Sequence, residues 1–303
     1  MTTADVTPLI VRLSIPSILT MLVTNIYNLA DTAFVGRLGT SASGAVGIVF
    51  AYMSIIQAFG FMFGQGAGSI LSRALGARDQ EYADRTASTG FFCSFGFGIL
   101  LALFSWFLID PLIRVLGSTE TIAPYARIYI SYILLAAPFM TASFTMNQIL
   151  RYEGKSAPGM IGMMTGGILN MIGDPILMFG FHMGIAGAGL STCLSQIIGF
   201  GILFRMFLGG RSLSRISPRY FSCSRAHILD IMATGLPSTL RQAMLSISAM
   251  MMNSCSAVYG DAAVAAMSIV SRIVILPFPL PWVSVRDSSR SVRLITAQPD
   301  TAG

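Results

Sequence analysis

Long apolar stretches alternate with short polar links along most of the chain, from residue 9 to about residue 275. The apolar stretches reach about 20 residues or more, the length that a helix needs to cross the hydrocarbon core of a bilayer. The strands of a membrane β-barrel would instead alternate within segments of about 10 residues. The pattern predicts membrane-spanning helices at residues 9–34, 42–71, 87–109, 122–150, 157–181, 184–207 and 226–258, with another beginning near residue 262.

The composition agrees with a membrane protein. Hydrophobic residues make up 54% of the 303 residues and charged residues only 11%, whereas soluble domains carry about 25% charged residues. We therefore predict an all-α, polytopic transmembrane helical bundle. The net charge of +6 does not indicate a nucleic-acid partner, because nearly all of the basic surplus lies in the links, where it determines membrane topology.

The basic residues are concentrated in alternate links. Cytoplasmic links of membrane proteins carry an excess of Lys and Arg. The links after the second, fourth and sixth segments are therefore predicted to be cytoplasmic, with the N-terminus on the same side and residues 35–41 outside. The residues that decide this are Arg73, Arg78 and Arg85, then Arg151 and Lys155, then Arg211, Arg215, Arg219 and Arg225.

The first and seventh segments resemble each other at an offset of 221 residues. Both segments begin on the same side of the membrane, because an even number of segments separates them. Parallel repeats of this kind occur in secondary transporters, although chance similarity between apolar helices is the alternative. The matches include Pro16-Ser17 with Pro237-Ser238, Gly39 with Gly260, and Ile48-Val49 with Ile269-Val270.

The end of the chain breaks this repeat. A complete second half would contain six segments, yet only the first two have begun by residue 275. Pro277, Pro279 and Pro281 then alternate ahead of a polar tail, and such a spacing does not continue a membrane helix. We expect a truncated chain with an unrelated tail from residue 276. The alternative is a genuinely short protein that pairs two copies.

Two carboxylates, Asp31 and Asp174, lie in or beside the first six apolar segments, away from the charged links. Carboxylates are costly in hydrocarbon and often mark ion or proton pathways. Each of the two has a plainer interpretation: Asp31 as an interfacial loop residue and Asp174 as a helix-end residue at the outer interface. Tyr27, one turn before Asp31, is either its partner or an aromatic residue of the membrane interface.

Asn170 precedes Asp174 by four residues, so the two side chains share one helix face. Pro175 removes a backbone donor and makes room for a cation or water. Carboxylate and amide oxygens suit a hard cation such as Na⁺, or a proton relay. Asn147 adds another amide, with a helix–helix hydrogen bond as the alternative.

Other motifs point to packing and not to chemistry. Gly60, Gly64 and Gly68 have the GxxxG spacing of closely packed helices. Met and Phe side chains could line an adaptable apolar pocket, although such residues more often face lipid or core. No Walker A motif, nucleophile elbow or metal-binding HExxH occurs in the sequence. We therefore expect no enzyme activity, no catalytic residue and no structural metal.

These features together resemble the MATE (multidrug and toxic compound extrusion) family, in particular the bacterial branch of MepA-like and DinF-like proteins. The resemblance covers residues 9–275. The matching motifs are Tyr27-Asn28-Leu29-Ala30-Asp31-Thr32-Ala33-Phe34-Val35-Gly36, Gln65-Gly66 to Gly76-Ala77, Arg151-Tyr152-Glu153-Gly154, Asn170-Met171-Ile172-Gly173-Asp174-Pro175, and Gly235-Leu236-Pro237 with Tyr259-Gly260-Asp261-Ala262-Ala263-Val264-Ala265-Ala266.

The resemblance implies two six-helix lobes in the bacterial inner membrane that exchange cationic amphiphilic drugs for Na⁺ or H⁺. It assigns the cation or proton site to Asp31, Asp174, Asn170, Asn147, Tyr27 and Thr192, with Na⁺ possible at Asp31, Asp174 and Asn170. The implied domains are an N-lobe (1–210), a cytoplasmic inter-lobe loop (211–225), the first part of a C-lobe (226–275) and a divergent tail (276–303).

The chain departs from the family pattern in two respects, and two other functions compete with the exporter interpretation. Segment seven holds no membrane carboxylate, which some family members have there, and most of the second lobe is missing. We therefore expect a truncated and non-functional exporter. One rival is a lipid-linked oligosaccharide flippase of the same superfamily, which would place more basic residues in its cavity. The other is a non-transporting membrane fragment.

Overall fold

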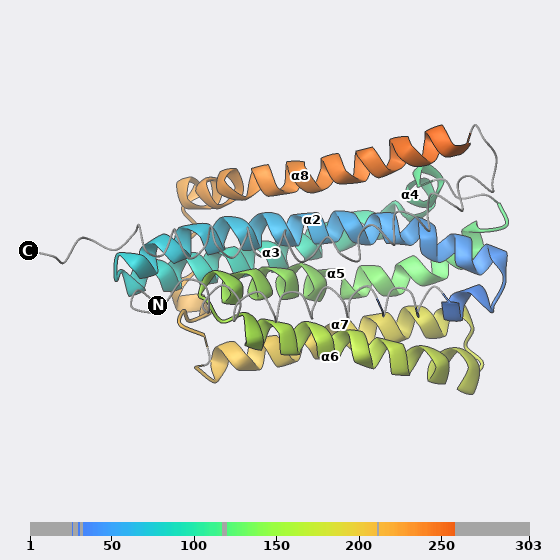
Figure 1. The fold of residues 1–303 in the computed structure, drawn as a ribbon, viewed down its shortest axis with the longest axis horizontal. Helices are drawn as coiled ribbons and strands as arrows, with labels where there is room; N and C mark the ends of the chain where they lie inside the picture. The colour runs from blue at the N-terminus through green and yellow to red at the C-terminus, as the bar shows by residue number, and fades with distance from the viewer. Residues whose placement is uncertain (1–25, 27–29, 31–32, 117–119, 211, 258–303) are drawn as a thin grey trace, which may run out of the picture.

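The computed structural model of the protein describes residues 26, 30, 33–116, 120–210 and 212–257. These residues form a bundle of long helices with no strand among them, so the all-α prediction is confirmed (Figure 1). The helices are α2 (Thr40–Gly76), α3 (Gln80–Phe107), α4 (Ile109–Val115), α5 (Ala123–Tyr152), α6 (Ser156–Pro175), α7 (Ile185–Leu208) and α8 (Arg225–Ala257). A π-helix, η1 (Ile176–Gly180), extends α6, and a 3₁₀-helix, η2 (Pro218–Tyr220), precedes α8.

Five helical stretches in the described part of the chain are long and apolar enough to cross a membrane. They coincide with the second to sixth predicted segments and confirm a multi-pass helical membrane protein. The seventh predicted segment is the helix α8. The first segment and the one predicted near residue 262 lie outside the described residues, together with the tail. The five stretches are Ser41–Gly76, Gln80–Phe107, Ala123–Tyr152, Ser156–Gly180 and Ile185–Leu208.

Two predicted links are shorter or more ordered than expected. The prediction of a charged loop from Arg73 to Arg85 is wrong. Helix α2 continues to Gly76 and α3 begins at Gln80, so most of these residues are helical. Long charged side chains can extend to water from helix ends, so charge alone did not mark the helix boundary. The predicted link between the third and fourth segments contains the short helix α4, whose length of seven residues gives little periodicity to detect.

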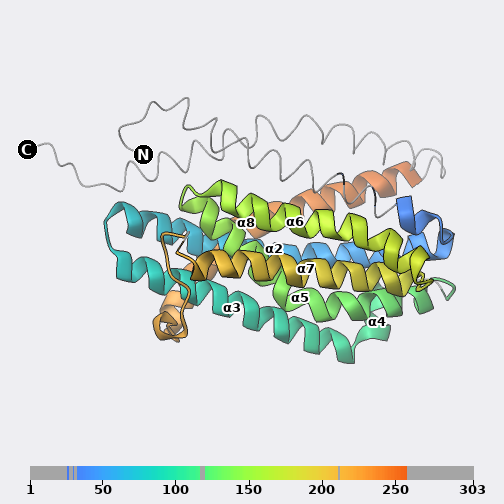
Figure 2. The same cartoon turned by 90° about the horizontal axis from the view of Figure 1, so that it is seen from below.

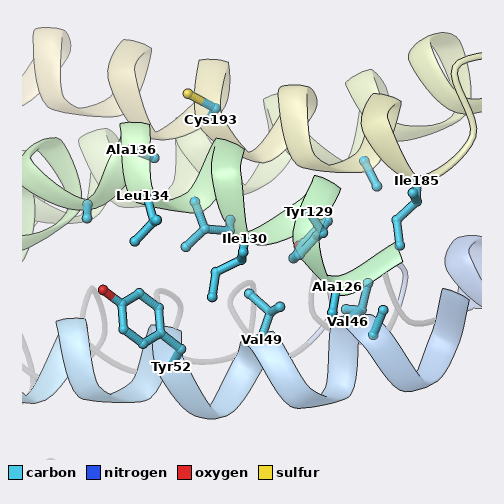
Figure 3. Close-up of a cluster of buried hydrophobic side chains, with 14 of the residues drawn as sticks. Val46, Val49, Tyr52, Ala126, Tyr129, Ile130, Leu134, Ala136, Ile185 and Cys193 are labelled. Atoms are coloured by element: carbon cyan, nitrogen blue, oxygen red, sulfur yellow. The ribbon is translucent and has the colours of Figure 1, made fainter. Parts of the chain in front are cut away.

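Helix α5 is the centre of the bundle. The most apolar window of α5 is 72% buried within the protein, against 22% to 50% for the other four spans. Its apolar side chains pack between α2 and α7 (Figure 3), where Tyr129, Ile130 and Leu134 are almost fully buried. On the α2 side they meet Val49 and Tyr52. We call the helices α2 to α7 the first bundle. This bundle is therefore organised around α5, which has protein on most sides.

Glycines on α2 let it approach α5 closely. A Cβ atom at Gly60 would lie 2.8 Å from the Cβ of Phe144, and one at Gly64 would lie 2.9 Å from the Cβ of Gln148. Such distances are too short for real side chains, so the two backbones are in near contact. The predicted close packing at the GxxxG positions is confirmed, with α5 as the partner helix.

Helix α8 crosses the outside of this bundle obliquely and contacts α2 (Figures 1 and 2). At the crossing, a Cβ atom on Gly66 would lie 2.0 Å from the carbonyl oxygen of Ile231, and one on Gly235 would lie 1.9 Å from that of Met62. The hydroxyl of Ser238 also donates a hydrogen bond to Gln65 beside this point. Two glycines thus set the spacing of α8 on the first bundle.

Candidate functional site

The last turn of α6 carries the Asn170–Asp174 pair predicted from the sequence. The Nδ2 of Asn170 donates to the Oδ1 of Asp174 at 3.0 Å, the one-turn contact expected from their spacing. Asp174 is fully buried and Asn170 is 5% exposed, so neither side chain faces water at the end of the helix. After Pro175 the helix widens into η1, where the N–H of Phe181 bonds to the carbonyl of Ile176. Such π-helical turns are frequent at functional sites.

Helix α7 supplies the opposite side of this cluster. The Nδ2 of Asn170 lies 3.2 Å from the Oγ1 of Thr192 and 3.4 Å from the Oγ of Ser191. The Ser191 hydroxyl donates to the Asn170 carbonyl at 3.2 Å. The Thr192 hydroxyl donates to Ala188 within its own helix, which leaves its oxygen to accept from Asn170. Asn170 therefore joins the carboxylate of Asp174 to two hydroxyls on the next helix.

A cavity between α2, α5, α6 and α7 adjoins this cluster, with about 60 Å³ of room for water-sized molecules. This volume is enough for more than one water molecule. Asn170 and Thr192 line the cavity, and Asp174 is connected to it through Asn170. The hydroxyl of Ser143, also in the lining, is buried and has no hydrogen-bond partner among the described residues. The cavity can therefore offer a polar group to a bound molecule.

The lining mixes polar and adaptable apolar groups. No Lys or Arg is among the described residues that line it. The polar members on α7 are Thr192, Ser195 and Gln196, which with Gly199 recur at the i, i+3, i+4, i+7 spacing of one helix face. This polar face was detectable in the sequence as a helical repeat, but Thr192 was its only member among the predicted site residues. The apolar lining is Val46, Phe50, Met53, Tyr129, Phe144, Met163 and Leu203, and Gln57 and Ser143 complete the polar set.

Asn147 lies elsewhere. Its Nδ2 donates to the carbonyl of Gly159 at 2.9 Å, which joins α5 to the beginning of α6. Gly159 and Asn170 are about 16 Å apart along α6, at 1.5 Å per residue. The structure therefore gives Asn147 the helix–helix hydrogen bond that was its alternative interpretation, and does not bring it to the Asn170 cluster. Asp31 and Tyr27 lie outside the described residues.

A second buried carboxylate, Glu153, did not stand out in the sequence. It lies in the predicted basic loop after the fourth segment, where an exposed position was the natural expectation. Glu153 is instead only 3% exposed, and Arg151 beside it is 8% exposed. Its carboxylate accepts hydrogen bonds from the backbone N–H groups of Leu213 and Ser214 at 2.9 and 3.0 Å. Partners about 60 residues away leave no local sequence signal.

The helical bundle has counterparts among known proteins. The model of the MatE family matches residues 16–176, just over half of the chain. The chain belongs to the MatE family. The matched region contains α2 to α6, including Asn170 and Asp174.

Solved structures of this family share the fold over nearly the whole chain. A multidrug resistance MATE family transporter in an outward-facing conformation is 31% identical, with a TM-score of 0.87, and the match covers 97% of this chain and 68% of that one. A MOP superfamily transporter from Pyrococcus furiosus is 32% identical with a TM-score of 0.85, over 97% of this chain and 64% of that one.

Curated relatives point to the same branch. The multidrug export protein MepA of Staphylococcus saprophyticus is 28% identical over 265 residues, and that of Staphylococcus aureus is 28% identical over 266 residues. Each match covers 87% of this chain. The chain spans 59% of the length of each of these relatives.

Proposed function

We propose that this MatE protein is part of a cation-coupled efflux antiporter that exports cationic amphiphilic compounds in exchange for Na⁺ or H⁺. The observation that carries the proposal is the buried Asn170–Asp174 pair bonded to Thr192 beside a polar cavity. The MepA relatives, which are named multidrug export proteins, support the substrate class.

The coupling follows from the hydrogen bonds of Asn170. A proton or Na⁺ at Asp174 neutralises its charge and weakens the carboxylate as an acceptor for the Asn170 amide. The amide can then turn toward Ser191 and Thr192, or toward the cation, and change how α6 and α7 are joined. Gly162 and Gly166 of α6 pack closely on α7 at the cavity, at Leu203 and Ser195 respectively. A change in the joint between these helices therefore changes the shape of the cavity.

In this proposal Asp31 is the second carboxylate of the cation site and Tyr27 is its neighbour, as the family resemblance implies. The N-lobe comprises residues 1–210 and is oriented with the N-terminus in the cytoplasm. The link from residue 211 to 225 leads into a second lobe that begins at α8. Asn147 holds α5 against α6 through its bond to Gly159 and takes no part in binding the cation.

The test uses the purified chain in liposomes and a fluorescent organic cation as the dye. It measures how Na⁺ and pH change the binding of the dye, and then whether an ion gradient drives the dye across the membrane. Asp174→Asn should abolish the effect of Na⁺ or pH on dye binding, because an amide cannot take up a proton or carry the negative charge. Asp110→Asn is the matched control, since Asp110 is an exposed carboxylate in an ion pair with Arg127. Asp31→Asn is expected to behave like Asp174→Asn.

The rival flippase function predicts a different outcome. Lipid-linked oligosaccharides carry phosphates, and a cavity for them should present basic side chains. The described lining presents none, which favours cationic over anionic substrates. Competition of dye binding by an anionic polyprenyl phosphate, with no response to Na⁺ or pH, would overturn the antiporter proposal. A chain that binds no dye at any pH or Na⁺ concentration would be the non-transporting fragment.

A further inference from the structure

The link between α7 and α8 is a basic strap at one end of the bundle. Three arginines lie in the strap and a fourth, Arg225, begins α8, with no acidic residue from Gly209 to Leu229. The strap follows the end of the α7 span at Leu208 directly and lies against the beginning of the α3 span. It is therefore held at the level where membrane-spanning helices meet water. The four arginines are Arg211, Arg215, Arg219 and Arg225, of which the last three are in the described residues.

The strap is fixed by hydrogen bonds to its backbone. Glu153 accepts from the N–H groups of Leu213 and Ser214, and Asp84 of α3 accepts from the N–H of Arg215 at 2.8 Å. Ser88 donates to the carbonyl of Arg215 at 3.0 Å. Because both peptide groups of Arg215 are held, its side chain is left to point away from the bundle.

Burial alternates along the fixed segment. Ser212, Ser214 and Ile216 are buried, whereas Leu213 and Arg215 are exposed. Such alternation is typical of an extended chain with one face on the protein and the other on its surroundings. The acidic groups that hold the strap bind its backbone and hydroxyls. Among the described residues, none forms an ion pair with Arg215, Arg219 or Arg225.

The outward face combines charge with apolar surface. Leu213 is 48% exposed, and Tyr220 and Phe221 are 36% and 37% exposed, next to exposed Arg215 and Arg219. We call these five residues the strap surface. Arginines among aromatic and aliphatic side chains, at the ends of membrane helices, suit the boundary between lipid headgroups and acyl chains. An acidic protein surface would match the charge but would leave the apolar side chains without a partner.

We propose that the strap surface binds the headgroups of anionic phospholipids in the leaflet on its side of the membrane. Arginine is well suited to this ligand because its planar guanidinium can donate two parallel hydrogen bonds to a phosphate. The apolar members of the strap surface lie at the depth of the upper acyl chains. The inference does not depend on transport by the cavity, so the two proposals can fail separately.

The test places a reporter on the strap surface of the full chain. Trp106 and Trp282 are replaced by Phe, and Tyr220→Trp supplies the only tryptophan. The protein is reconstituted in phosphatidylcholine vesicles that contain either brominated phosphatidylglycerol or brominated phosphatidylcholine at equal mole fraction. We expect stronger quenching by the brominated phosphatidylglycerol, and we expect high salt to reduce this excess because exposed charges are screened.

Arg215→Gln with Arg219→Gln should remove the excess quenching, with lipid affinity falling about fivefold for each arginine lost. The matched control is Arg37→Gln with Arg114→Gln, two exposed arginines at the opposite end of the bundle, and it should retain the excess. Circular dichroism checks that each variant is folded. The salt dependence of the unsubstituted strap tests the proposal even if the double variant does not fold.

Equal quenching by the two brominated lipids would overturn the proposal. So would an excess that survives high salt or the double substitution. Inorganic phosphate added to the vesicles should leave the excess unchanged at constant ionic strength, because a membrane surface presents many headgroups at once. Loss of the excess with phosphate would instead identify a site for a free anion and would overturn the assignment to lipid.

Discussion

Glu153 and Asp174, two of the buried carboxylates of the first bundle, are chemically alike but lie in different surroundings. Glu153 accepts hydrogen bonds from three consecutive residues of the strap: from the hydroxyl of Ser212 at 2.8 Å, from two backbone N–H groups, and from the hydroxyl of Ser214. Asp174 is bonded to Asn170, which in turn meets hydroxyls on α7 beside a cavity.

This difference separates a structural carboxylate from a candidate functional one. The partners of Glu153 are two backbone N–H groups and two hydroxyls on three consecutive residues, all fixed once the strap has docked, so its bonds define one arrangement. The described partner of Asp174, Asn170, is a side chain that can turn, next to space for water. Burial is common to both residues. What distinguishes them is whether the surrounding donors can be rearranged.

The largest expected effect is at Glu153. Glu153→Gln replaces an acceptor by a group with two donors facing two backbone N–H groups, and we expect a loss of about 3 kcal/mol in the free energy of unfolding. The strap should also detach, so that trypsin cuts faster after Arg215 and Arg219. Unfolding in denaturing detergent and timed proteolysis measure the two effects.

Glu120→Gln is the control for this change, because Glu120 is exposed. Asp174→Asn provides the contrast. It should change the unfolding free energy by less than about 1 kcal/mol, because removal of a buried charge offsets the loss of a charged hydrogen bond. If Asp174→Asn unfolded the protein and Glu153→Gln did not, the two roles would have to be exchanged.

The next effect distinguishes two buried amides. Asn170→Ala should cost about 2 kcal/mol and remove the response of dye binding to Na⁺ or pH, because it disconnects Asp174 from Thr192. Asn147→Ala should cost about 1 kcal/mol through loss of the bond to Gly159 and leave that response intact. Stability and dye binding measured on both variants test this pair. An equal loss of response in both would place Asn147 in the site after all.

The smallest expected effect is a pH dependence at the strap end, from His227 in the first turn of α8. Its ring nitrogens lie 3.5 Å from the hydroxyl of Tyr82 and 3.4 Å from that of Thr86, both on α3. Burial and the neighbouring Arg85 lower the pKa of His227, and Asp230 raises it to a smaller extent. With a folded pKa below the unfolded value of about 6.5, folding disfavours the protonated ring.

The contact of α8 on α3 should therefore have its full stability above about pH 6.5 and weaken as the pH falls below that value. Thermal unfolding of the protein at neutral and mildly acidic pH measures the change. His227→Gln should reduce the pH dependence, whereas His182→Gln should preserve it because His182 is exposed. An unchanged pH profile in His227→Gln would assign the effect to other groups.

Much of the fold could be predicted from the sequence because the bilayer imposes helix length directly. Apolar runs predicted at residues 122–150 and 184–207 became Ala123–Tyr152 and Ile185–Leu208. The Asn170–Asp174 contact followed from helical spacing. Asn147, also a polar residue in an apolar segment, could not be assigned in the same way, because its partner is a backbone carbonyl that only the packing of α5 on α6 brings near.

The role of Glu153 also could not be predicted from the sequence. Its neighbours in the chain are charged, and a charged link normally faces water. The bonds to Leu213 and Ser214 exist because α5 and α7 end at the same side of the bundle and the chain then folds back across them. Such a contact depends on how α5 and α7 are arranged and on the path of the chain after α7. No local sequence pattern records either.

The crossing of α2 and α8 limits how the protein can vary over evolution. Any side chain at Gly66 or Gly235 would have to move a backbone carbonyl of the facing helix, because the Cβ atom would lie within 2.0 Å of it. The displacement would be carried along the whole of α8, a rod of 33 residues. We therefore expect related sequences to conserve the small residue at both positions, or to change both together, while the lipid-facing positions around them drift freely.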